Sequence, residues 1–153
     1  MNSKKKFMKK LFVTISILGF ICIGSVYAQS NTPTAVLTSF HKSFNSAANE
    51  SWSTVKDLYK ADFTSDDEKL SAFFNDEGKL IASSRNVTLL QIPLSLKSDL
   101  KKNFDDFEVA SIFEVDKEDG TIYYATIKNS KKQLALESTS SGDWVEHRKI
   151  TDN

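Results

Sequence analysis

The feature of this sequence that most constrains its fold is a pattern that occurs twice. Pro33 and Pro93 stand 60 residues apart, and apolar residues at every fourth position follow each proline. Residues four apart lie on one face of a helix, so each set predicts an amphipathic helix. A proline suits the start of a helix because its missing N–H would have no partner there. The matched apolar residues are Val36, Phe40 and Phe44 in the first copy and Leu96, Leu100 and Phe104 in the second.

The repetition continues beyond the helices with one insertion. After the polar turn at 117–120 the offset becomes 64, and Gly78 then matches Gly142. Alternating apolar residues between short polar turns predict antiparallel strands after each helix. The strands are expected at 52–56, 58–64, 69–75 and 79–85 in the first copy, and at 108–116, 121–128, 132–138 and 144–149 in the second.

We therefore predict an α+β fold made of two tandem αββββ repeats, at residues 29–92 and 93–153. No linker rich in Pro, Gly or Ser separates the repeats. They are therefore expected to share an interface or a single sheet, and the sequence leaves open which of the two holds.

Residues 1–28 have the composition of a cleaved signal peptide. A basic segment precedes an uncharged apolar run at 11–23, and the small residue Ala28 stands where signal peptidase cleaves. An uncleaved membrane anchor is the weaker alternative, because this run is shorter than the ~20 residues that span a bilayer. We expect a periplasmic or secreted protein that begins at Gln29.

The leader also contains the only cysteine and a quarter of the basic residues. Cys22 is a poor lipoprotein site, because lipoprotein processing requires a small residue before the cysteine and Ile21 is large.

Five of the 20 basic residues leave with the leader, so 15 basic residues remain against 20 acidic ones. A net charge near −5 disfavours nucleic acid and an anionic membrane surface as partners. Without a disulfide, the mature chain must be held together by its core, for which its length suffices.

Several short motifs of the mature chain resemble one known family. These are Trp52-x-x-Val55, Tyr59-x-Ala61-x-Phe63, the block AFFNDEGKLIASSR at 72–85, the helix that begins at Pro93, and Tyr123-Tyr124-Ala125. Together they make the chain similar to the beta-lactamase-inhibitor-like, PepSY-like family of bacterial periplasmic proteins. The resemblance implies two αββββ units with one antiparallel sheet face against the helices. It also implies a role in binding or inhibiting another protein, although a shared scaffold does not fix function.

The residues that commonly carry catalysis are sparse. His41 and His147 are the only histidines, and no nucleophile motif accompanies them. The acidic runs 66–68 and 116–120 lack the spacing of a calcium-binding loop and are better explained as solvated turns. We predict a protein that is not an enzyme and that needs no metal and no cofactor.

Two pairs of neighbouring aromatic residues point to a surface. Adjacent residues of a strand face opposite sides of a sheet. The alternation around Phe74 and Tyr123 assigns those two to the core, which leaves Phe73 and Tyr124 on the other face. Aromatic anchors contribute much of the energy of protein interfaces. We predict an exposed partner-binding face at Phe73, Tyr124, Lys60 and Lys128, with Asp62 and Thr126 nearby.

The function favoured by these observations is that of an exported, non-catalytic binding module. It would bind or inhibit a periplasmic protein or peptide through the exposed sheet face. The alternative is a structural or self-associating envelope accessory protein without a discrete ligand. In that case the same face would be covered by a loop, by the chain ends or by a second copy of the protein.

Overall fold

The structure is a computed structural model that describes residues 32–150 of the chain. The predicted leader at residues 1–28 and its cleavage site lie outside this range. Within the described residues, no helix is long and apolar enough to cross a membrane.

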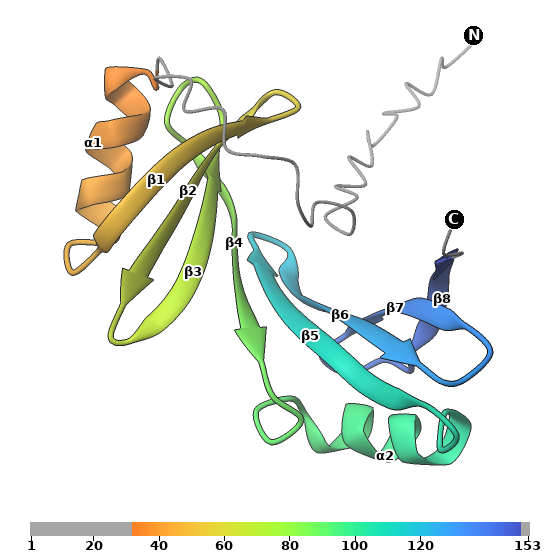
Figure 1. The fold of residues 1–153 in the computed structure, drawn as a ribbon. Helices are drawn as coiled ribbons and strands as arrows, with labels where there is room; N and C mark the ends of the chain where they lie inside the picture. Colours follow the sequence, from red (N-terminus) through yellow and green to blue (C-terminus); the bar gives the residue numbers. More distant parts are fainter. Residues whose placement is uncertain (1–31, 151–153) are drawn as a thin grey trace, which may run out of the picture.

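In the part of the chain that the structure describes, two helices and eight strands follow one another in the order helix, four strands, helix, four strands (Figure 1). The first group is α1 (Thr34–Ser43), β1 (Ala48–Val55), β2 (Leu58–Ser65), β3 (Glu68–Phe74) and β4 (Leu80–Val87); the second is α2 (Leu94–Asn103), β5 (Glu108–Lys117), β6 (Gly120–Lys128), β7 (Gln133–Thr139) and β8 (Val145–Ile150).

All eight strands belong to one antiparallel sheet, in which they follow one another in chain order. The sequence left open whether the two halves share an interface or a single sheet, and the centre of this sheet gives the answer. There β4 pairs with β5, in a register that runs from Ala82 opposite Lys117 to Val87 opposite Ile112. The two halves of the chain therefore share a continuous sheet, and α2 lies in the connection between its two central strands.

Both helices begin and end in the same way. Each follows a proline whose carbonyl accepts the first helical hydrogen bond, from Leu37 N in α1 and from Lys97 N in α2. Each then ends at a phenylalanine, Phe44 or Phe104, whose N–H still bonds back into the helix. After each phenylalanine a short turn follows, which directs the chain into the next strand. The two prolines therefore stand at the helix starts, as the pattern predicted, whereas Phe44 and Phe104, which were expected on the apolar stripes, come just after the last helical residues.

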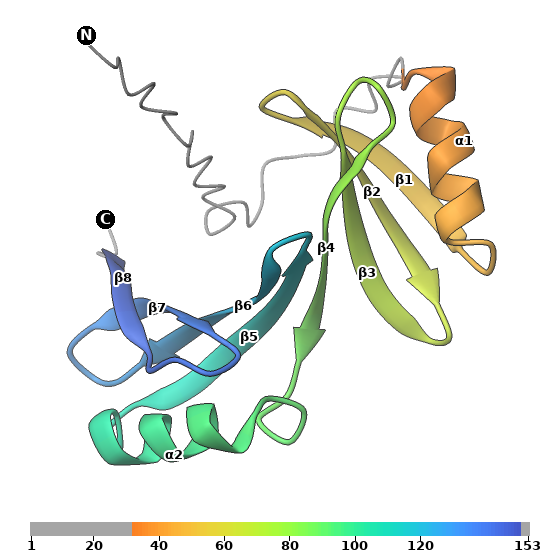
Figure 2. The ribbon, with the colours of Figure 1, turned by 180° about the vertical axis from the view of Figure 1, so that it is seen from behind.

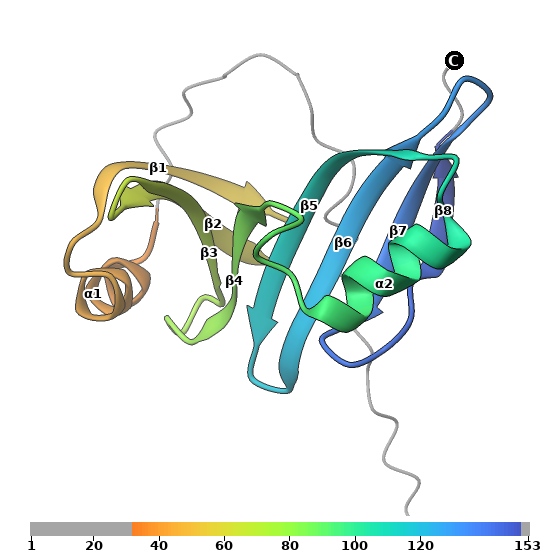
Figure 3. The same cartoon turned by 90° about the horizontal axis from the view of Figure 1, so that it is seen from below.

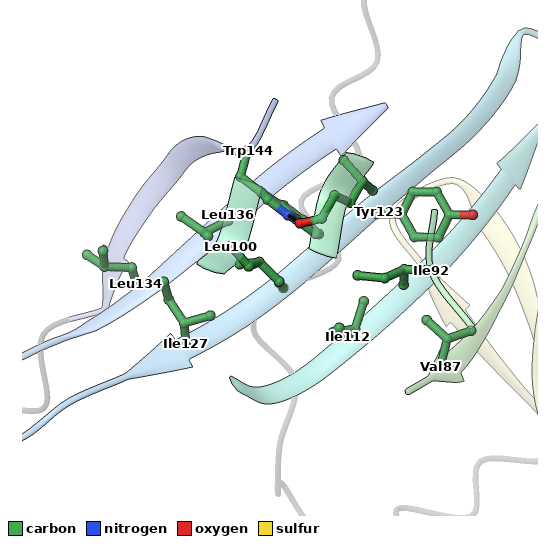
Figure 4. Close-up of a cluster of buried hydrophobic side chains, with 11 residues drawn as sticks. Val87, Ile92, Leu100, Ile112, Tyr123, Ile127, Leu134, Leu136 and Trp144 are labelled. Carbon is green, nitrogen blue, oxygen red and sulfur yellow. Dashed lines mark hydrogen bonds between the residues drawn. The ribbon is translucent and has the colours of Figure 1, made fainter. Parts of the chain in front are cut away.

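The helices pack on the same side of the sheet, each against the strands of its own half (Figure 3). Val36 and Phe40 of α1 are fully buried and contact Ala61, Phe63 and other residues of β2 and β3. The second half has a larger cluster, in which Leu96 and Leu100 of α2 meet apolar residues of β5, β6 and β7 (Figure 4). Trp144 closes this cluster by donating from its indole Nε1 to the carbonyl of Leu96 at 3.0 Å.

The strand boundaries differ from the predicted ones mainly in β1. This strand starts at Ala48, four residues before the predicted start, and contains a bulge between Ala48 and Ser51. Asn49 takes a positive φ of 55° within that bulge. The early start follows from the tight turn after Phe44, because its carbonyl accepts the N–H of Ala47 and reverses the chain at once.

Candidate binding face

Phe73 and Tyr124 lie on the sheet face opposite the helices, as the alternation predicted, but the expectation that they are exposed is wrong. Phe73 is 3% exposed and Tyr124 is 8% exposed. They form a third buried cluster with Ala82 and Val115, and Phe113 packs against its edge. The two aromatic side chains therefore belong to a core and do not stand on a surface.

The reason for their burial is the shape of the sheet. The two halves of the sheet meet at an angle along β4 and β5, with the helices on the outer side of the bend (Figures 1 and 2). The inner face is therefore concave, and its central side chains are brought against one another. Ala82 lies directly opposite Phe73 in the ladder, and its small side chain leaves room for the ring. Burial also raises the pKa of the Tyr124 hydroxyl, and the nearby Glu137 carboxylate adds to this rise.

Beside this cluster, the concave face of the first half contains an open groove of about 500 Å³. Most of its lining side chains come from the inward-facing positions of β1 to β5. These are Asn49, Ser51, Lys60, Asp62, Thr64, Lys69, Ser71, Ser84, Asn86 and Phe113. The groove is thus a polar trough with one aromatic ring at its central end.

Ionic and hydrogen-bonding contacts order one wall of the groove. Lys60 Nζ lies 2.8 Å from a carboxylate oxygen of Asp62, and the Ser71 hydroxyl donates to the same oxygen. Lys69 and Asn86 are exposed at the groove, and neither forms an ion pair or side-chain hydrogen bond with another described residue. The groove therefore offers a cation, an amide and an aromatic edge to a second molecule.

The structure brings together only some of the predicted site residues. Lys60 pairs with Phe73 across β2 and β3, so Lys60, Phe73 and Tyr124 all belong to the same part of the concave face. Lys128 lies apart, at the end of β6 opposite Glu108, and does not line the groove. Any role of these four residues in binding a partner stays a prediction.

Of the ten groove residues, the sequence reading named only Lys60 and Asp62; it missed the other eight, among them Lys69, Asn86 and Phe113. The alternation in β3 already placed Lys69 and Phe73 on the same face, so the sequence contained a signal for Lys69. Asn86 and Phe113 meet because they are direct partners in the β4–β5 ladder. That pairing joins segments separated by a helix, and no local pattern indicates it.

A second polar cluster lies on the helix-bearing face at the junction of the two halves. Glu114 is 9% exposed and accepts hydrogen bonds from Arg85 Nε at 2.7 Å and from the Tyr123 hydroxyl at 2.9 Å. Arg85 also reaches Glu68 at 3.0 Å. Burial, and next the Glu114 carboxylate, raise the pKa of Tyr123 to about 12. These contacts pair a buried charge and bridge the two halves, which is a structural role.

The histidines lie far apart along the chain and contact single carboxylates. His41 Nδ1 is 3.9 Å from Glu50, and His147 Nδ1 is 3.1 Å from Glu137. Among residues 32–150, no group of three or more His, Cys, Asp or Glu side chains is placed to hold a metal ion.

Comparison with known proteins shows which solved structures share this fold. No family model and no curated protein matches the sequence. Solved structures do match. A BLIP-like protein from Bacteroides fragilis is 15% identical with a TM-score of 0.69, over 79% of this chain and 89% of that one. A protein from Bacteroides eggerthii described as periplasmic is 20% identical with a TM-score of 0.73, over 78% and 90%.

A DUF2874 family protein from Bacteroides uniformis is 15% identical with a TM-score of 0.73, over 77% of this chain and 89% of that one. These TM-scores establish a common fold, while sequence identities this low leave the function open. In each case the likeness extends over both halves, because it covers more than three quarters of this chain. The chain therefore has the fold of the BLIP-like and DUF2874 family proteins.

Proposed function

We propose that the protein is an exported, non-catalytic module that binds a periplasmic protein or peptide in the groove of its concave face. The observation that supports this most directly is the groove itself, a trough of about 500 Å³ over β1 to β5. It lies on one continuous sheet whose central aromatic residues are already packed. Such a preorganised surface loses little conformational entropy when a partner binds.

The fold neighbours support both the class of function and the compartment. One of them is described as BLIP-like and another as periplasmic. A periplasmic location agrees with the signal peptide predicted at residues 1–28. Inhibition of the bound partner is the more specific form of this proposal. It would follow if the segment held in the groove belonged to the active site of an enzyme.

The chemistry of the groove indicates the kind of segment that fits. Lys69 provides a positive charge at the groove, while the charge of Lys60 is balanced by Asp62. Phe113 is half-buried and presents part of its ring. An extended segment with a carboxylate for Lys69 and an apolar side chain for Phe113 complements these groups.

We also infer that the two halves, 29–92 and 93–153, are repeats of one αββββ unit. The helix boundaries recur at an offset of 60, from Pro33 and Phe44 to Pro93 and Phe104. The hairpin turns support an offset of 64, because Gly78 N bonds to Asn75 O while Gly142 N bonds to Thr139 O. A duplicated unit explains how so short a chain builds a wide sheet with a helix under each half.

Site-specific cross-linking tests the proposed groove. A photoreactive residue at position 86 lies in the groove, whereas one at position 102 lies on exposed α2, on the other side of the sheet. In the native host, illumination should join a discrete envelope protein to position 86 and leave position 102 without that adduct. Mass spectrometry then identifies the partner.

A charge reversal provides the matched control. Lys69→Glu in the groove should reduce the adduct at position 86 at least tenfold, because it repels an acidic segment, whereas Lys102→Glu should leave it unchanged. Both lysines are exposed, so both variants should fold. Equal adducts from positions 86 and 102, or no adduct at 86, would count against the groove as the binding site.

A further inference from the structure

The connection between β4 and α2, together with the first residue of α2, presents an unusual group of apolar side chains to solvent. Leu89 is 43% exposed, Leu90 is 87% exposed and Leu94 is 76% exposed. Three of the six exposed large apolar residues among the described ones therefore fall within six consecutive positions. Scattered exposed leucines are ordinary, but contiguous exposed apolar groups mark interaction sites.

The outward position of these leucines is fixed by the structure of the loop. Thr88 N donates to Gln91 Oε1 at 2.8 Å, and Gln91 N donates to Thr88 O at 3.0 Å. The next residue, Ile92, is buried in the core of the second half. Lys97 Nζ then binds the carbonyl of Leu90 at 2.9 Å and holds the loop to α2. The loop is therefore a closed turn that directs Leu90 outwards.

An apolar groove of about 490 Å³ lies directly beside this projection. Leu89 and Leu90 line it, together with Phe104, Phe107 and Val109 and with charged residues of α2 and the turn that follows. This groove and the polar groove of the concave face have no lining residue in common. The surface thus combines a protruding leucine with an adjacent apolar hollow, and it is separate from the proposed binding face.

We propose that this surface joins two copies of the chain in a two-fold symmetric dimer, with Leu90 of each copy in the apolar groove of the other. In such a dimer the same patch serves on both subunits, so it must complement itself. The shape of this patch can complement itself, because the projecting Leu90 lies beside the apolar groove. Its charges can also complement themselves, because Lys97, Lys101 and Asp105 all line the groove. A lysine of one copy can meet Asp105 of the other.

The same features argue against an anionic lipid surface as the occupant. Lipid association rewards a cluster of basic residues around the apolar side chains. Here Asp105 and Asp106 lie beside the lysines, and the expected mature chain has 15 basic residues against 20 acidic ones. An interface with an apolar centre and a rim of both charges is typical of protein–protein contacts.

The oligomeric state of the exported, purified protein tests this proposal. Sedimentation should show a concentration-dependent monomer–dimer equilibrium for the wild type. Leu90→Glu should weaken dimerisation at least about tenfold, because it removes a central apolar contact and places a charge there. Val145→Glu, at another exposed apolar residue that is 65% exposed, should leave the equilibrium unchanged. Asp105→Lys should weaken the dimer, and adding Lys101→Asp should restore it.

Each contrary outcome is informative. A wild type that stays monomeric at the highest concentrations, or a Leu90→Glu variant that dimerises normally, would overturn the proposal. So would a monomer that co-sediments with phosphatidylglycerol vesicles through Leu90. Cross-linking at position 86 should proceed in Leu90→Glu as in the wild type, so the dimer and the binding groove can fail independently.

Discussion

At the scale of single residues, the Arg85–Glu114–Tyr123 cluster combines a buried carboxylate with two hydrogen-bond donors. Glu114 is a buried carboxylate, and its two oxygens accept from Arg85 and Tyr123 at 2.7 and 2.9 Å. Removing one partner of such a group is costly, because the other is left buried without its counter-charge. The hydroxyl of Tyr123 is also held protonated, with its pKa raised to about 12 by burial and by Glu114.

This pKa gives stability a defined pH dependence. In the unfolded chain the Tyr123 hydroxyl ionises near pH 10, but in the folded protein it keeps its proton to about pH 12. Its stabilising contribution is therefore complete below pH 10 and is lost as the pH rises to 12. Tyr123→Phe should be less stable than the wild type by about 1–2 kcal/mol at pH 7. Urea unfolding at pH 7, 10 and 11.5 should show this difference shrinking, and a constant difference would contradict the expectation.

Gly78 illustrates a different kind of constraint on one residue. Its φ is +82°, and a Cβ atom at this position would lie 2.6 Å from the carbonyl oxygen of Ala35 in α1. Gly120 has a φ of +127° but open space around it. Gly78→Ala should therefore cost at least about 1 kcal/mol more than Gly120→Ala, because only Gly78→Ala adds a clash to the backbone strain. Chemical denaturation of the two variants measures this difference.

At the scale of the elements, the sheet face opposite the helices determines the architecture. Phe73 of β3 and Tyr124 of β6 fill the inside of the bend, together with small and medium residues of β4 and β5. Residues 32–150 thus contain three apolar clusters, one under each helix and one inside the curve of the sheet. The third cluster joins strands of both halves and so stabilises the bend.

This arrangement changes what a mutation at Phe73 should do. An exposed Phe73 could be truncated without loss of stability, but a ring that is 3% exposed cannot. Phe73→Ala should lower the free energy of unfolding by about 3–5 kcal/mol, and Phe113→Ala, which removes a half-buried ring, should lower it less. Thermal or urea unfolding measures these losses of stability and so distinguishes a buried Phe73 from an exposed one. A Phe73→Ala variant as stable as the wild type would show that the ring does not belong to a core.

At the scale of the whole molecule, the two halves are parts of one sheet joined by six residue pairs of the β4–β5 ladder. They should therefore unfold together. In a Trp52→Phe variant, fluorescence comes from Trp144 in the second half, whereas far-UV circular dichroism reports the helices and strands of both halves. The two signals should give the same urea midpoint. Separate midpoints would mean that the halves are independent folding units.

The sequence allowed much of this molecule to be predicted, for identifiable physical reasons. Helical spacing and the two prolines located both helices, and alternation placed Phe74 and Tyr123 towards the helices and Phe73 and Tyr124 on the other face. These are local properties of the chain. The bend of the sheet is not local, because it depends on how Ala82, Val115 and their neighbours pack after the strands have paired. Exposure and groove residues such as Asn86 depend on that bend, and they could not be predicted.

The pairing of β4 with β5 also has a consequence for the order in which the protein is made. The first half emerges from the ribosome before the second, so β1 to β4 can pair while β5 is still absent. During that interval β4 is an open strand edge, which another chain could extend. Arg85 projects from β4, and charged side chains on an edge oppose such pairing. Glu114 is synthesised later, as part of β5, and its carboxylate accepts a hydrogen bond from the Arg85 guanidinium. Arg85, which protects the edge of the unfinished sheet, therefore becomes a contact between the two halves of the finished one.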